Sequence, residues 1–397
     1  MPERRKRVLV VAPAPIVSVI LLLIKPLSVL QREGAIEARY VLPRGCAEHD
    51  VKWADVVVFC RATDIFEFRI LQRARSLGKP VIYDTDDNLF DVPGDSAVAR
   101  YHRDPLRQRI LRLLHAEADL VHVYNRELES IARTLNPNVK RMPQAFDFSL
   151  LSKVNVQKRN NIAIAFPTSR GGDDRLSLMF RDAVEAVIRE RPHAFTLHVW
   201  GGAPKPLQGL PNLIVEPFEP DYNEFIRRLY SSSFAIGLAP LVDDAHHRCK
   251  TELKFREYGA CRIAGIYSDV SPYKDAVNHG ETGLLVSNDP VGWAGALRSL
   301  LLDGDLRNRI VSSAEAHVRR HYSLDAAAKA WDASLETVLS IPQRKNSACE
   351  ANRLHSILAR DLSPAKRTLW ALRLLKPKAL TRLRRNSEWL RAAVQRG

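Results

Sequence analysis

Paired cysteines are missing from this sequence. The chain has 397 residues and five cysteines, and none of the five stands in a CxxC spacing. We therefore expect neither a disulfide framework nor a cysteine-based zinc site, and the cysteine usage fits a reducing compartment such as the cytoplasm. The five are Cys46, Cys60, Cys249, Cys261 and Cys349.

Long hydrophobic stretches are scarce as well. The best candidate, residues 8–24, follows the basic start MPERRKR, as the apolar core of a signal peptide or membrane anchor would. Pro13 and Pro15 interrupt it, and it lies at the short edge of the ~20 residues that span a bilayer. We expect a buried strand over residues 8–12, a loop, and a helix that ends near Gly34. A signal anchor is the alternative.

Internal repeats and low-complexity tracts are also absent, which argues against solenoids and disordered chains. What the sequence does contain is an alternation of short apolar runs with longer amphipathic segments. Such alternation predicts βαβ units with parallel sheets covered by helices on both faces. The runs are residues 8–12, 55–59, 80–84, 120–124, 162–166, 195–200, 213–218, 234–240, 263–268 and 283–287.

A polar stretch, SKVNVQKRNN at residues 152–161, separates the runs into two series. We therefore predict an α/β protein with two doubly wound, Rossmann-like domains and a ligand cleft between them. The amino-terminal domain is predicted over residues 1–153. The carboxyl-terminal domain is predicted over residues 154–341, with a crossing helix at residues 323–340, and a basic helical tail over residues 342–397.

Residues that follow strands are the candidates for a site, because ligands of open parallel sheets bind beyond the carboxyl ends of the strands. Lys250 precedes a helical pattern, and its ammonium together with the N–H groups of a helix start suits a phosphate. Glu257, two turns along, can accept hydrogen bonds from the hydroxyls of a ribose. The next strand leads to Ser268, Asp269 and Tyr273, where backbone N–H groups can complete a diphosphate site.

The segment KTELKFREYGACRIAGIYSDVSPYKDAVNHGETGLLVSND resembles a signature of the GT-B glycosyltransferases. It is similar to the carboxyl-domain signature of bacterial family-4 (group 1) retaining enzymes of envelope polysaccharide synthesis. LNPNVKRMPQAFDFSLL and LRNRIVSSAEAHVRRHYSLDAAAKAW are similar to further parts of that family, so that the resemblance runs from about Val8 to about Leu339. It implies the GT-B fold, a nucleotide-diphosphate sugar donor, a glycan or glycolipid acceptor, and no cofactor or metal.

Two departures from the family pattern affect the donor side. The family motif has two glutamates separated by seven residues; Glu257 matches the second, and Cys249 stands at the place of the first. Arg170 matches an arginine that grips the diphosphate, but residues 171–174 replace the lysine that follows it. Lys250 is then expected to supply that charge.

On the acceptor side, the resemblance implies catalytic residues in the loop after residues 80–84. Where such enzymes usually carry a histidine, this chain has Asp84, Asp86 and Asp87, similar to the loop of one subset of these bacterial enzymes. One of these carboxylates could act as base on the attacking hydroxyl, with Arg61 nearby. Capping of a turn by the aspartates and a plain salt bridge for Arg61 are the alternatives.

Positive charge is concentrated at the carboxyl end. The chain carries a net +15, and residues 351–397 contribute 12 Lys and Arg against two acids, so 12 − 2 = +10. This tail and the missing glutamate motivate an alternative function, a degenerate GT-B protein that binds nucleic acid or acts as a scaffold. Sugar-nucleotide epimerisation is a further alternative. His246 and His247 are expected to be exposed loop residues.

The tail also interleaves leucines and tryptophans with cations in AKRTLWALRLLKPKALTRLRRNSEWLRAAV, and Pro377 divides it into two predicted helices. Such a basic amphipathic helix binds anionic membrane surfaces, with about 1 kcal/mol per cation close to the surface. Packing of its leucines on the first domain is the alternative.

If the tail binds membranes, full-length protein will co-sediment with anionic vesicles and be released by salt, whereas a chain that ends at Gln343 will stay in the supernatant. Equal sedimentation of the two proteins would contradict the membrane role of the tail.

Overall fold

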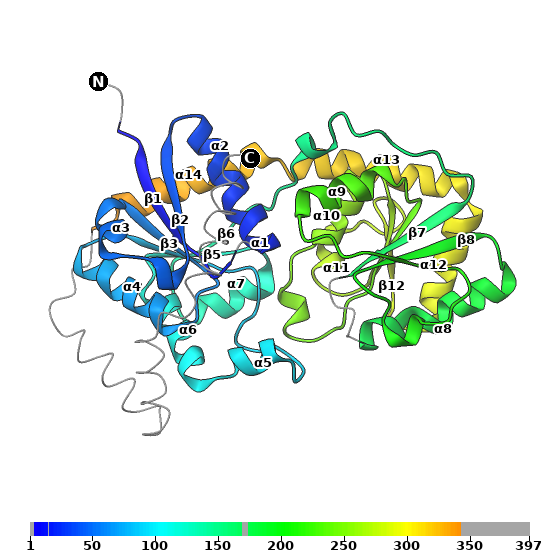
Figure 1. The fold of residues 1–397 in the computed structure, drawn as a ribbon, viewed down its shortest axis with the longest axis horizontal. Coiled ribbons are helices and arrows are strands. Elements are labelled where there is room, and N and C mark those ends of the chain that lie inside the picture. The colour runs from blue at the N-terminus through cyan, green and yellow to red at the C-terminus, as the bar shows by residue number, and fades with distance from the viewer. Residues whose placement is uncertain (1–3, 15, 169–173, 343–397) are drawn as a thin grey trace. The chain divides into compact units, whose positions relative to one another are not determined.

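The computed structural model describes residues 4–14, 16–168 and 174–342, which form two compact units. Unit 1 comprises the chain up to Ala145 and the helix that begins at Leu324, and unit 2 runs from Phe146 to Ser323 (Figure 1). Each unit contains one sheet of six parallel strands with helices packed on it. The predicted α/β fold with two doubly wound parallel sheets is confirmed.

The sheet of unit 1 has the strand order β2-β1-β3-β4-β5-β6. Along the chain the elements are β1 (Lys6–Val11), α1 (Val17–Val19), η1 (Ile20–Ile24), α2 (Lys25–Arg32), β2 (Ile36–Val41), η2 (Pro43–Gly45), α3 (Glu48–Trp53), β3 (Val56–Cys60), α4 (Ile65–Ser76), β4 (Val81–Asp84), α5 (Ala97–His102), α6 (Pro105–Glu117), β5 (Leu120–Val123), α7 (Arg126–Arg133), β6 (Val139–Arg141) and, after unit 2, α14 (Leu324–Ser340).

The sheet of unit 2 has the order β12-β11-β10-β7-β8-β9. Its elements are η3 (Phe148–Leu151), β7 (Ile162–Pro167), α8 (Asp174–Glu190), β8 (Phe195–Trp200), η4 (Lys205–Leu207), β9 (Leu213–Glu216), α9 (Tyr222–Ser231), β10 (Ile236–Ala239), η5 (His247–Cys249), α10 (Leu253–Ala260), β11 (Ala264–Ser268), α11 (Tyr273–Ala276), β12 (Leu284–Val286), α12 (Pro290–Leu302) and α13 (Gly304–His321).

Every predicted apolar run overlaps a strand, and two further strands lie outside the runs. β3 and β4 are buried at every position, as expected for central strands covered on both faces. The additional strands β2 and β6 are the two edges of the unit 1 sheet. An edge strand needs no continuous apolar run. In β2, with the sequence IEARYV, only Ile36 is fully buried, so the sequence shows no apolar run there.

The apolar amino-terminal stretch forms β1 and then one continuous helical segment over residues 17–32. Gly34, with φ of +80°, follows its end, as predicted for the helix that ends near this residue. Within the described part of the chain, no helix combines the length and apolarity needed to cross a bilayer. The middle of the segment, η1, is a π-helical turn that ends at Ile24, two residues before Pro26.

Pro26 accounts for a long-range hydrogen bond within unit 1. A proline has no N–H, so Pro26 cannot donate to the carbonyl of Leu22 four residues earlier. Trp331 of α14 supplies a donor instead, because its indole Nε1–H lies 2.8 Å from the Leu22 carbonyl oxygen. Only 1% of the Trp331 surface is exposed, so this bond is made in the core.

Helix α14 belongs to unit 1 although it follows unit 2 in the chain. It packs along α2 (Figure 1), and Lys6 at the start of β1 donates to Asp332 at 2.8 Å and Glu336 at 3.2 Å. α14 lies within the range 323–340 given for the crossing helix, and it groups with the first unit. The units divide at Ala145–Phe146 and at Ser323–Leu324, whereas the predicted boundary lies after residue 153.

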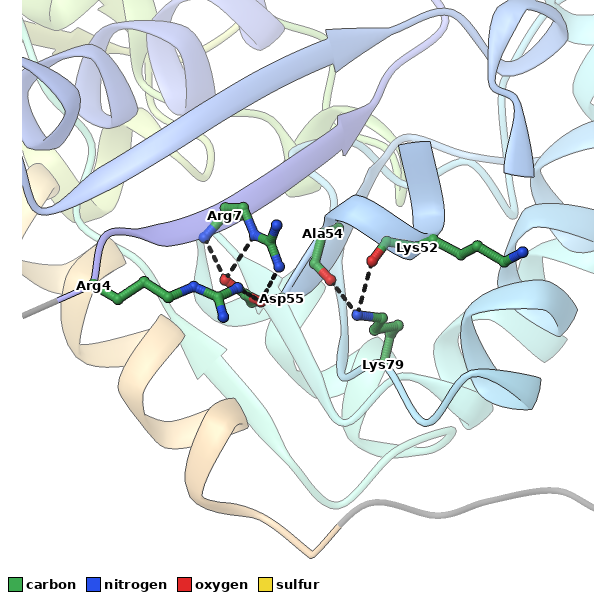
Figure 2. Close-up of polar contacts among 6 residues, drawn as sticks. All are labelled: Arg4, Arg7, Lys52, Ala54, Asp55 and Lys79. Carbon is green, nitrogen blue, oxygen red and sulfur yellow. Dashed lines mark hydrogen bonds and ion pairs between the residues drawn. The ribbon is translucent and has the colours of Figure 1, made fainter. Parts of the chain in front are cut away.

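The amino edge of the unit 1 sheet is held by polar contacts (Figure 2). Asp55 accepts hydrogen bonds from the backbone N–H of Arg7 at 2.9 Å and from the guanidinium of Arg4 at 2.9 Å. Burial alone would raise the pKa of Asp55, but hydrogen bonds from the side chain and backbone of Arg7, with the charges of Arg7 and Arg4, lower it below its usual value. Lys79 donates to the carbonyls of Lys52 and Ala54. These charges join β1, α3 and β3, and they lie at the end of the sheet away from the predicted site.

The Trp331 bond yields a test. Trp331→Phe keeps an aromatic ring but removes the donor, so we expect unfolding by urea to show a loss of about 1 to 3 kcal/mol, the cost of leaving a buried carbonyl without that partner. Pro26→Ala restores an N–H four residues after Leu22. It should recover part of the loss in the Trp331→Phe protein and give a smaller gain in the native background. Strictly additive effects of the two substitutions would contradict this coupling.

Candidate functional site

Parallel pairing brings the predicted residues of unit 1 together. β3 and β4 are neighbours with Cys60 opposite Asp84, so the residues that follow both strands meet at one edge of the sheet. The guanidinium of Arg61 forms ion pairs with Asp86 at 3.1 Å and with Asp87 at 2.9 Å. The sequence places one of the predicted residues after β3 and the other three at the end of β4 or after it. In the structure they form one cluster, which consists of Arg61, Asp84, Asp86 and Asp87.

Arg61 holds this cluster in an uncommon backbone conformation. Its φ is +52°, and its N–H donates to the carbonyl of Asp84 at 2.9 Å. Burial alone would lower the pKa of Arg61, but the carboxylates of Asp86 and Asp87 raise it above its usual value. The guanidinium therefore stays charged and faces two acids, and Ser18 after β1 accepts a further bond from it at 3.4 Å.

Asp84, the last residue of β4, is the completely buried member of the cluster. Its carboxylate accepts from the hydroxyl of Tyr124 at 2.8 Å, and Nδ1 of His122 lies 3.6 Å away. Burial raises the pKa of Asp84 although the contacts with His122 and Tyr124 oppose the shift. A catalytic role for Asp84 stays a prediction. Its surroundings suit a residue that positions the loop, whereas Asp86 and Asp87 lie nearer the surface.

Glu257 in unit 2 is buried on α10 with a lysine beside it. Its side chain is 1% exposed, and Oε2 lies 2.7 Å from Nζ of Lys254. Burial and the nearby Glu257 carboxylate both raise the pKa of the Tyr222 hydroxyl. The sequence reasoning missed Lys254 as a site residue. The signal that could have revealed it is the spacing of three residues, which places the two side chains on one face of a helix.

Lys250 follows the short turn η5, in which the burial of the histidines differs from the prediction. It is half-buried, and its N–H donates to the carbonyl of His247 at 3.1 Å. His246 and His247, predicted to be exposed, are both buried. The reason is local: Asp244 accepts from the His247 backbone and lies 2.8 Å from its ring Nδ1, and the His246 ring packs edge-on against the His247 ring with centroids 5.4 Å apart. Burial alone would raise the pKa of Asp244, but these hydrogen bonds lower it.

The predicted donor loop after β11 is tied to both neighbouring strands. Ser268 is fully buried, and its hydroxyl oxygen accepts the N–H of Leu241 after β10 at 2.8 Å. The N–H of Asp269 donates to Val286 of β12 at 2.7 Å. Tyr273 packs its ring on Tyr267 with centroids 5.1 Å apart. These contacts explain the shape of the loop, and direct donor contacts by Ser268, Asp269 and Tyr273 remain predictions.

Two remaining predictions can be placed against the structure only in part. Arg170 lies outside the described residues. Cys249, at the position of the missing glutamate, is buried with 1% of its surface exposed. Among the residues that the structure describes, no three His, Cys, Asp or Glu side chains gather in an arrangement that could hold a metal ion.

Part of unit 2 matches a known protein family. Residues 174–303 match the family described as Glycosyl transferases group 1, which includes α10, Lys250 and Glu257. No curated protein matches the chain significantly.

Solved structures share the fold at low sequence identity. A glycosyltransferase from Rickettsia africae is 12% identical with a TM-score of 0.63, covering 86% of this chain and 100% of its own. HepE from Anabaena, solved with UDP-glucose, is 13% identical with a TM-score of 0.60, covering 83% and 99%. A putative UDP-N-acetylglucosamine 2-epimerase from Listeria monocytogenes is 12% identical with a TM-score of 0.53, covering 86% and 98%.

These findings confirm the resemblance to GT-B glycosyltransferases of group 1. The chain has the GT-B fold, with a group 1 glycosyltransferase match in its second unit.

The Arg61 cluster can be tested by its charges. Arg61→Gly relieves the positive φ and removes the guanidinium that faces two largely buried carboxylates, so we expect a loss of about 3 kcal/mol in unfolding free energy. Adding Asp86→Asn and Asp87→Asn should recover most of that loss. Chemical denaturation measures both, and an Arg61→Gly protein as stable as the native one would show that the ion pairs contribute nothing.

Proposed function

We propose that this chain is a glycosyltransferase that moves a hexosyl group from a nucleotide-diphosphate sugar to a hydroxyl of a growing, lipid-linked glycan in cell-envelope polysaccharide synthesis. The observation that carries the proposal is the group 1 match over residues 174–303, the region that contains the buried Glu257. Retention of configuration at the transferred carbon, as in the enzymes that the sequence resembles, is part of the proposal.

Unit 2 holds the donor in this proposal. A carboxylate buried on a helix loses most of its hydration, so a ligand hydroxyl that donates to it forms a strong, charge-assisted bond. Lys254 occupies one oxygen of Glu257, Oε2, and hydroxyls of a ribose are the proposed donors to this carboxylate. Lys254 also orients this carboxylate, because its ammonium lies only 2.7 Å away.

Breakage of the glycosidic bond leaves negative charge on the nucleotide diphosphate. Groups that stabilise this charge lower the barrier only if they interact more strongly with the transition state than with the bound donor. Lys250, Arg170 and the backbone N–H groups of the loop after β11 are the proposed groups. Cys249 carries no charge that could replace the family glutamate, so the sugar itself must be held by other residues.

Unit 1 binds the acceptor in this proposal. Arg61 faces two carboxylates, so the cluster keeps a net negative charge after pairing. A sugar hydroxyl is a hydrogen-bond donor, and a carboxylate with accessible lone pairs is its natural acceptor. Asp87 or Asp86 would orient the hydroxyl and take its proton as the new bond forms, while Asp84 below supports the loop.

The cellular location at which the enzyme would act follows from the proposed acceptor. A lipid-linked glycan is presented at a membrane, and the nucleotide-sugar donor is cytoplasmic. The enzyme would therefore work in the cytoplasm at the inner face of the membrane, where the basic tail would attach to anionic lipid. The tail lies outside the described residues.

Donor binding can be tested by thermal unfolding with UDP-glucose, GDP-mannose and other sugar nucleotides. A ligand at a hundred times its dissociation constant stabilises the native state by about 2.7 kcal/mol, which raises the melting temperature clearly. Glu257→Gln should weaken binding of the active donor by about 1.5 to 3 kcal/mol, because a neutral amide replaces the charged acceptor. Each variant is compared with its own melting temperature without ligand.

Glu224→Gln is the matched control, since Glu224 is an exposed residue of α9 in the same unit. No shift with any sugar nucleotide for folded native protein would count against the proposal, and a shift that Glu257→Gln leaves unchanged would remove the ribose role of α10.

Epimerisation is the second candidate, favoured by the likeness of the fold to the Listeria epimerase. Incubation with the bound sugar nucleotide in the absence of an acceptor separates the two reactions. An epimerase converts the donor to its epimer, whereas a transferase leaves it intact or hydrolyses it slowly.

A further inference from the structure

A row of polar side chains crosses the middle of the unit 1 sheet. Strand pairing places Cys60 of β3 opposite Asp84 of β4, and Asp84 opposite His122 of β5. Lys140 of β6 continues the row opposite His122. Paired residues of neighbouring strands have their side chains on one face of the sheet, so these four lie side by side. Helix α14 covers this face, because the Trp331 ring meets His122 edge-on with centroids 4.6 Å apart.

Asp84 and His122, at the centre of the row, are isolated from water and from other charges. Neither side chain has any exposed surface. Nδ1 of His122 lies 3.6 Å from Oδ1 of Asp84, and within the described residues no other basic side chain lies at ion-pairing distance from this carboxylate. In the same part of the chain, neither ring nitrogen of His122 has a hydrogen-bond partner. The two side chains therefore depend on each other for charge compensation.

The groups around the pair supply hydrogen bonds rather than a compensating charge. The hydroxyl of Tyr124 donates to Asp84 at 2.8 Å, and Sγ of Cys60 lies 3.7 Å from its second oxygen. The ammonium of Lys140 is directed to α14, where it donates to Oγ of Ser334 at 2.9 Å. Both neutral donors would serve an ionised or a protonated carboxyl group.

This isolation determines which ionisation state of the pair is favourable. With Asp84 ionised and His122 neutral, the core would contain a whole negative charge without a paired cation, which costs far more than one unsatisfied neutral N–H. One additional proton, on either the carboxylate or the ring, makes the pair neutral as a whole. Burial raises the pKa of Asp84 and lowers that of His122, and the attraction between them opposes both shifts. The raised pKa of Asp84 favours retention of this proton.

We propose that Asp84 and His122 hold one dissociable proton between them at neutral pH, and that His122 is thereby the positioning residue for the loop of Asp86 and Asp87. The backbone N–H of Arg61 donates to the carbonyl of Asp84, and its guanidinium pairs with Asp86. A neutral pair leaves the negative charge of the cluster on Asp86 and Asp87. The consequence for the acceptor rests on the proposed function, whereas the shared proton does not.

The pH dependence of unfolding tests the shared proton. Above pH 7 an unfolded chain has ionised aspartate and neutral histidine, so unfolding releases the proton and stability falls as pH rises. Asp84→Asn together with His122→Phe removes both titrating groups. The ratio of the unfolding equilibrium constants, native over double variant, should rise about tenfold between pH 7 and 8. It should be level between pH 5 and 6, where the unfolded histidine carries a proton of its own. A level ratio from pH 7 to 8 would overturn the proposal.

His115→Phe is the matched control for this experiment. His115 of α6 is a buried histidine whose Nδ1 lies 2.8 Å from the carbonyl of Leu111, and burial lowers its pKa to about 4. It is therefore neutral in both the folded and the unfolded protein above pH 7. The corresponding ratio for this variant should be level from pH 7 to 8, and native protein should lose stability relative to it only as pH falls below about 6.5.

Nitrogen NMR of the histidine rings in native protein is a test that needs no folded variant. A pair with one dissociable proton has a hydrogen on Nε2 of His122 in either arrangement, whereas an ionised Asp84 beside a neutral ring holds the hydrogen on Nδ1 and leaves Nε2 bare. Nε2 should be protonated at pH 7, and a bare Nε2 with a protonated Nδ1 would overturn the proposal. Neither experiment uses a sugar nucleotide, so these failures leave the proposed function standing, and failure of donor binding leaves the shared proton standing.

Discussion

Parallel strand pairing is the constraint on which the rest of this structure depends. In each unit six strands run in one direction, so the residues after them gather at one edge of the sheet. In unit 1 this places Arg61 after β3 against Asp86 and Asp87 after β4. In unit 2 it places Gly201 beside Phe218 and joins Ser268 to the backbone after β10. The chemistry of both units follows from which residues the chain carries at these positions.

The same architecture requires that the faces of the sheets be covered, and in unit 1 the cover comes from distant parts of the chain. α14 returns after the whole of unit 2 and packs on α2. Pro26 leaves the Leu22 carbonyl without its usual helical donor, and the buried indole of Trp331 supplies one. His122, beneath the acidic cluster, meets the same indole edge-on at 4.6 Å. The helix that completes the fold therefore also supports the residues under the candidate acceptor site.

The two candidate sites differ in how their charges are balanced. In unit 1 one guanidinium faces two carboxylates, which leaves acceptor capacity for hydroxyl groups. In unit 2 the buried Glu257 has its own lysine, and Asp244 lies 2.8 Å from Nδ1 of His247. Charges held in this way are already oriented before a ligand arrives, so binding does not have to order them.

The apolar runs by themselves determined the fold class, because strands buried on both faces must be continuously apolar. They also determined which loops carry charge at the carboxyl edge, and the KTELKFREYGA pattern indicated the helix of Glu257. Tertiary structure decided what a linear pattern does not encode. The edge strands β2 and β6 have too little burial to show in the pattern. His246 and His247 are buried because Asp244 holds one ring and the two rings pack together. Lys254 matters because the helical spacing places it beside Glu257.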